Sequence, residues 1–203
     1  METEIITATI QQTRRLSETP KNLSESLLPS TSKVFRSFGT SDEFLMKVTP
    51  DTQQAFSRLI ERAVTGDYPT LTEIGLAYGD WFPAKWLSVQ IADTTLFVGA
   101  KNLDKWQQKK LAELIATEYH YLKVTELLVF FHRFKTGRYG HFYGSVDAHI
   151  VMCSLREFIT ERNDVIADVE QREREQREAE ERKHAISYEE YLKLKAENQN
   201  NAI

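Results

Sequence analysis

Cysteine is nearly absent from this sequence of 203 residues, which contains only Cys153. A single thiol excludes an intramolecular disulfide and a cysteine-based zinc site built within one chain. It is also typical of proteins from a reducing compartment. Residues 1–16 lack the basic start and apolar core of a signal peptide. We therefore expect a cytoplasmic protein.

Long apolar runs and an excess of positive charge are missing as well. No stretch approaches the roughly 20 apolar residues of a membrane span, so no membrane contact is expected. The formal net charge is -4, so a nucleic-acid contact would depend on a local basic patch. Hydrophobic residues make up 41% of the chain, a low share that places some of its length outside a packed core.

Helical spacing of the apolar residues predicts an all-α fold with three parts. Residues 1–48 are polar and broken by Pro20 and Pro29, which predicts a flexible, loosely packed N-terminal arm. Residues 49–169 carry the periodic apolar positions and predict a multi-helix globular core domain. Residues 170–203 predict a charged tail that continues a long, projecting C-terminal helix.

One segment of the predicted body is ambiguous between helix and β-hairpin. Leu87 and Ile91 have helical spacing, whereas Thr94 and Thr95 also suit a strand. We expect a helix over residues 84–97.

Capping residues predict where several helices begin. Thr49, followed by a proline, starts one helix, which Gly66 ends. Thr125 is expected to cap the helix that follows it, and Asp147 to cap the long final helix. The helix after Thr125 is apolar on nearly every face, which predicts that it is the buried centre of the domain. The three tryptophans are interpreted as core residues rather than as a ligand cage; they are Trp81, Trp86 and Trp106.

The tail has almost no apolar face before Ile186. Acidic and basic residues recur in it at i, i+4 spacing, which stabilises an exposed helix by about 0.2–0.5 kcal/mol per pair. Ser187 and Glu190 then have the spacing of a capping box and predict one further short helix. We interpret the tail as a solvated helix; the alternative is a docking arm that folds against a partner protein.

Residues 133–147 are the candidate binding loop, because three of the eight glycines of the chain lie in it among basic and aromatic side chains. Gly137 suits the end of a helix, where glycine accepts a positive φ without steric cost. The order GxxxxGK[ST] of a phosphate loop is absent. Phe142 is expected to turn inward as an anchor. The candidate binding residues are Arg133, Lys135, Arg138, Tyr139, His141 and Tyr143.

Two functions suit such a loop. Its tyrosines can stack on a base or on a partner side chain, and its cations can pair with phosphate or carboxylate groups. The alternative is an interhelical connection whose aromatic rings pack on the core.

Histidines near this loop offer a catalytic alternative. His132, His141 and His149 are close in sequence, and Asp147 lies between two of them. No HExxH pattern and no recognisable nucleophile accompanies them. We therefore assign no catalytic residue and no metal ligand, and we expect no cofactor.

The pattern E-L-x-x-F-F, F-K-x-G-x-Y-G-x-F-Y-G-x-x-D, F-x-x-x-R resembles a family of small bacterial proteins of unknown function from genomes rich in phage and integrative elements. The resemblance covers about residues 103–165. It implies no known activity and so transfers no catalytic residue. Where the pattern has proline after the aspartate, this chain has Ala148. The matching residues are Glu126, Phe130, Phe131, Phe134, Lys135, Gly137, Tyr139, Gly140, Phe142, Tyr143, Gly144, Asp147, Phe158 and Arg162.

We therefore expect a non-enzymatic interaction protein of a phage or mobile element, such as a DNA-replication accessory or regulatory factor that acts through the 133–147 loop. The expected partner is another protein, with nucleic acid as an alternative through the local basic and aromatic patch. Two other functions stay open. One is a small enzyme that uses the neighbourhood of His132, His141 and Asp147, and the other is a toxin, immunity or anti-defence factor.

Overall fold

The computed structural model describes residues 29–58, 60–98, 103–140 and 146–184. In these ranges the backbone forms helices, turns and one isolated bridge, and it forms no strand, which confirms the all-α prediction. The helices are α2 (Pro29–Phe38), α3 (Ser41–Lys47), η1 (Pro50–Thr52), α4 (Gln53–Phe56), α5 (Ile60–Thr65), α6 (Leu71–Tyr78), α7 (Phe82–Val98), α8 (Lys105–Glu118), α9 (Val124–Lys135) and α10 (Ala148–His184).

Reciprocal capping boxes explain where three of these helices begin. In each box the side chain of the first residue accepts a hydrogen bond from a backbone N–H one turn on, and the partner side chain accepts one from the cap's own N–H. The boxes pair Thr40 with Glu43 before α3, Thr70 with Glu73 before α6, and Asp104 with Gln107 before α8.

The ambiguous segment is a helix, because α7 runs unbroken from Phe82 to Val98. The single helix expected after Thr49 is instead divided into η1, α4 and α5. A tertiary contact accompanies this division. Gln53, at the start of α4, is buried and donates a 2.7 Å hydrogen bond to Oε1 of Gln90 on α7.

The centre of the body is α9, as its apolar sequence predicts: every residue from Val124 to Phe131 is buried. The expected cap of this helix was wrong. Glu126 Oε2 accepts the backbone N–H of Lys123 at 2.7 Å, whereas the hydroxyl of Thr125 donates to the carbonyl oxygen of Ala63 at 2.8 Å. Thr125 therefore ties α9 to α5 instead of beginning the helix.

Helices α2 and α3 belong to the segment expected to be a loosely packed arm, and both pack on the body. Val34 and Phe44 are 2% and 0% exposed. The Phe44 ring meets the rings of Phe82 and Trp86 edge to face, at 5.4 and 6.4 Å between centroids. Residues 1–28 of the expected arm lie outside the described residues.

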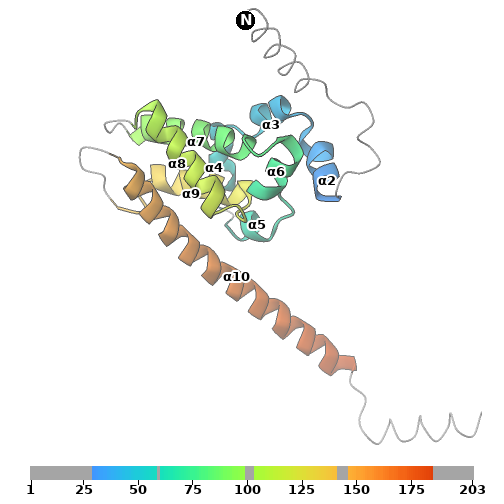
Figure 1. Ribbon diagram of the computed structural model, residues 1–203. Helices are drawn as coiled ribbons and strands as arrows, with labels where there is room; N and C mark the ends of the chain where they lie inside the picture. Colours follow the sequence, from blue (N-terminus) through green and yellow to red (C-terminus); the bar gives the residue numbers. More distant parts are fainter. Residues whose placement is uncertain (1–28, 59, 99–102, 141–145, 185–203) are drawn as a thin grey trace, which may run out of the picture.

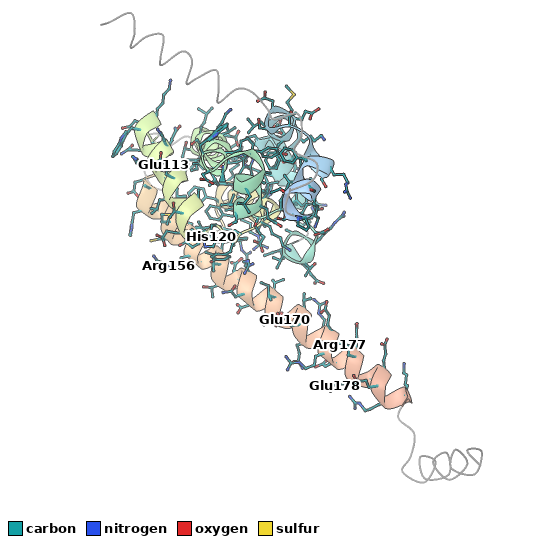
Figure 2. All side chains as sticks on the ribbon, turned by 45° about the vertical axis from the view of Figure 1, so that its right-hand side comes forward. Glu113, His120, Arg156, Glu170, Arg177 and Glu178 are labelled. Atoms are coloured by element: carbon teal, nitrogen blue, oxygen red, sulfur yellow. The ribbon has the colours of Figure 1, made fainter. Side chains whose placement is uncertain are left out.

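Helix α10 begins on the body and then leaves it (Figure 1). Asp147 caps it as predicted, since Asp147 Oδ1 accepts the N–H of Ile150 at 2.8 Å. At 37 residues, the helix is about 55 Å long. Arg172 pairs with Glu61 of α5 at 2.7 Å. Figure 2 shows Arg177 and Glu178 along the part of α10 that extends past the body.

None of the helices that the structure describes is long and apolar enough to cross a membrane.

Candidate functional site

The predicted loop begins with a tight turn at the end of α9. Gly137 and Gly140 have φ values of 76° and 108°, which confirms the predicted positive φ of Gly137. The N–H of Arg138 donates to the carbonyl oxygen of Arg133 at 3.1 Å, which closes the helix. Of the other candidate binding residues, His141 and Tyr143 lie outside the described residues, as does Phe142.

Two arginines of the predicted site converge on one carboxylate of α10. Glu161 accepts Arg133 Nη1 at 2.5 Å and Arg138 Nε at 2.9 Å. The Arg133 side chain is 16% exposed and that of Arg138 is 52% exposed. The hydrogen bond to Glu161, and then its charge, raises the pKa of Arg138. Glu161 thus neutralises much of the positive charge on which the phosphate-binding hypothesis depends.

Lys135 and Tyr139 are also engaged with the body. Lys135 pairs with Asp93 of α7, and its ammonium group lies 5.5 Å from the centre of the Phe97 ring. The Tyr139 ring lies 5.9 Å from that of Phe130, and its burial raises the pKa of the phenol. Of the four described candidates, only Arg138 is exposed. The described part of the loop therefore joins α7, α9 and α10.

His132 and Asp147, which belong to the catalytic alternative, have different environments in the structure. Partial burial of His132, and then the nearby charges of Lys135 and Arg133, lowers the pKa of its imidazole. Asp147 caps α10. In the parts of the chain that the structure describes, no three His, Cys, Asp or Glu residues form a group that could hold a metal ion.

Arg138→Ala tests the binding role of the turn. The side chain is half exposed and its ion pair lies near the surface, so we expect a change of at most about 1 kcal/mol in the free energy of unfolding. If the turn is a binding surface, partner affinity falls while the melting temperature falls by no more than about 4 °C. Calorimetry and a binding measurement on the same preparation separate the two effects. A variant that unfolds far below the parent would identify Arg138 as a structural residue.

A concave surface that the sequence did not indicate lies between α7 and α8. It is an open groove of about 680 Å³. Its small side chains are Ala84 and Ser88 from α7 and Ala116 and Thr117 from α8. The remaining lining residues are Asp80, Trp81, Lys85, Val89, Lys105, Gln108, Lys109 and Glu113. We call this surface the α7–α8 groove.

Trp81 is the largest side chain of the α7–α8 groove, and it is exposed but held in place. Its exposed fraction is 57%. The ring meets Phe82 edge to face at 5.7 Å, and the ammonium group of Lys85 lies 5.1 Å from its centre. Gly79 has a φ of 106°, and a Cβ atom on it would lie 2.8 Å from Nε1 of Trp81. The indole therefore packs against the backbone at position 79, where only glycine leaves room for it.

The groove has a small net positive charge, whereas the net charge of the whole chain is negative. Glu113 accepts Lys110 at 2.7 Å and lies 3.8 Å from Lys109, and the hydrogen bond from Lys110 is the main cause of its lowered pKa. Lys85 and Lys105 form no ion pair with any residue that the structure describes. Three lysines and two carboxylates line the groove, whereas the chain carries a net charge of -4.

The interpretation of the tryptophans as core residues was right only for Trp86, which is fully buried. Trp81 and Trp106 are 57% and 67% exposed. The sequence carries a weak signal for this difference. Trp81 directly follows Gly79-Asp80, and Trp106 lies between Lys105 and a glutamine in the first turn of α8.

A comparison with known protein families found a match for the C-terminal part of the chain to a family without assigned function. Residues 103–201 match a family of unknown function, DUF6633. The match includes α8, α9, the predicted loop and α10, and it begins after α7. The search of curated proteins and the search of solved structures each found no match.

Proposed function

We propose that the protein is a non-enzymatic interaction protein that binds a helical segment of another chain in the α7–α8 groove. The observation that carries this proposal is Trp81, a large aromatic side chain that is mostly exposed and yet fixed by its neighbours. Tryptophan is enriched among the residues that dominate binding energy at protein interfaces. An anchor already held in place loses little conformational entropy on binding.

The dimensions of the groove fit a short helix. Its α8 wall extends from Lys105 to Thr117, which is about 18 Å at the rise of an α-helix. A helix of about three turns would lie along it. Helix-in-groove recognition uses apolar side chains on one face of the ligand helix, and alanines and small hydroxyl residues leave room for them here.

The partner is expected to be a protein rather than a nucleic acid. Arg133 and Lys135, two cations of the predicted loop, are mostly covered and are paired with Glu161 and Asp93. Phosphate binding would require these pairs to break, whereas the groove is available as it stands. The sequence resembles a family from genomes rich in phage and integrative elements. On this basis we propose further that the protein belongs to a phage or mobile element and that its partner is a replication or regulatory protein.

Site-specific photo-crosslinking in the native host tests this function. A photoreactive amino acid at Val89, which lines the groove and is 45% exposed, is expected to yield a nuclease-resistant protein adduct. The matched control is the same amino acid at Met46 of α3, which is 78% exposed and lies outside the groove. Equal adduct yields at the two positions, or no adduct at Val89, would refute the proposal.

A further inference from the structure

We propose that residues 187–197 of a second copy of this chain occupy the α7–α8 groove. This inference rests on the proposed function, because it requires the groove to be a helix-binding surface. It also gives the tail a role as a docking arm.

The sequence of the segment complements the groove. In SYEEYLKLKAE, Tyr188, Tyr191 and Leu192 have i, i+3 and i+4 spacing, which places them on one face of a helix. The segment carries three glutamates and two lysines, a net charge of -1, and the acidic residues Glu189 and Glu190 lie together near its start. The aromatic and aliphatic face suits Trp81 and the small side chains of the groove, and the acidic start of the segment suits Lys85 and Lys105, which form no ion pair with a described residue.

The lengths of segment and groove agree. A helix of these 11 residues would be about 16 Å long, against about 18 Å for the α8 wall. As a helix, the segment would therefore be long enough to lie along most of the groove.

The geometry of α10 prevents the segment from entering the groove of its own chain. Arg172 still contacts the body through Glu61, and α10 continues for another 12 residues to His184, about 18 Å further. Residues 185 and 186 can bridge at most about 11 Å between His184 and Ser187. In Figure 2, Glu113 of the groove and Glu178 of α10 lie toward opposite ends of the molecule.

Two copies can instead bind each other through two tail–groove contacts. In such a pair, the tail segment of each copy would bind the groove of the other copy. A pair of copies related by a two-fold axis makes the same contact twice, which closes the assembly as a dimer.

Analytical ultracentrifugation of the full chain tests this inference. The wild type is expected to dimerise reversibly with concentration. Trp81→Ala, which removes the groove anchor, and the double variant Tyr191→Asp/Leu192→Asp, which charges the apolar face of the tail, should each weaken dimerisation about thirtyfold or more. Leu96→Ala, at a 70% exposed α7 position outside the groove, and Asn198→Asp/Asn200→Asp, with the same added charge beyond the segment, should dimerise like the wild type.

Mixing the two weakened variants gives the sharpest readout. The Trp81→Ala chain keeps its tail and the tail variant keeps its groove, so an equimolar mixture should recover one tail–groove contact and form a heterodimer. Far-UV circular dichroism confirms that both variants are folded. A wild type that stays monomeric, a tail variant that dimerises normally, or a mixture without heterodimer would each overturn the inference. If Val89 still crosslinks another protein in that case, the proposed function stands without it.

Discussion

Phe44→Ala is expected to lower the free energy of unfolding by about 3–5 kcal/mol. The side chain is fully buried, and its ring contacts Phe38, Tyr78, Phe82 and Trp86. Removing it leaves a cavity between α3, α6 and α7 that these large rings cannot fill without leaving their positions. Thermal and chemical denaturation measure the effect, which should lower the melting temperature by roughly 6–20 °C for a chain of this size.

Met46→Ala is the matched control, because Met46 lies on the same helix and is 78% exposed. It should change the free energy of unfolding by less than about 0.5 kcal/mol. Equal and small effects at both positions would show that α3 contributes little to the folded state. The segment 29–48 would then behave as the loosely packed arm that the sequence predicts.

Glu126→Ala should cost about 3–5 kcal/mol as well, for an electrostatic reason. Glu126 is fully buried in α9, and it accepts Arg162 Nε at 2.7 Å and the N–H of Lys123 at 2.7 Å. Alanine removes both contacts and leaves the guanidinium group of Arg162, which is 16% exposed, without its carboxylate. Urea denaturation near neutral pH measures the loss.

Glu126→Gln separates the charge of Glu126 from its hydrogen bonds, and its effect should depend on pH. Burial raises the pKa of Glu126 above its ordinary value of 4.5, against the opposing effects of Lys123 and Arg162. A carboxyl group whose pKa is raised on folding stabilises the native state fully below the unfolded pKa, and this contribution is lost as pH rises through the folded pKa. Glutamine does not titrate there. The stability of the wild type relative to this variant should therefore be greater at about pH 4.5 than at about pH 7; the opposite trend would mean that pairing with Arg162 outweighs burial.

Local signals in the sequence predicted much of the fold. The continuous apolar run of α9 indicated its burial, because a helix that is apolar on most faces must be surrounded by protein. The positive φ of Gly137 and the cap at Asp147 follow from backbone preferences that act within a few residues. Residues 84–97 proved helical, so their apolar periodicity outweighed the strand preference of Thr94 and Thr95.

The candidate site was less predictable, because its contacts connect distant parts of the chain. Arg133 meets Glu161 at a separation of 28 residues, and Lys135 meets Asp93 at a separation of 42. Spacing in the sequence marks the cations of the turn, but not the carboxylates that neutralise them. The exposure of Trp81 was missed because composition alone places tryptophan in the core, whereas Gly79, Phe82 and Lys85 hold this indole at the surface.

If the tail segment binds the groove as proposed, the length of α10 beyond the body makes occupancy of the groove depend on protein concentration. A tethered ligand normally meets its site at a high effective concentration, but a tether that cannot span the distance lowers that concentration almost to zero. The part of α10 from Arg172 to His184 would act as such a tether. The groove should therefore be vacant in a dilute protein and fill as the number of copies in the cell rises, so that changes in expression would alter which partners can enter it.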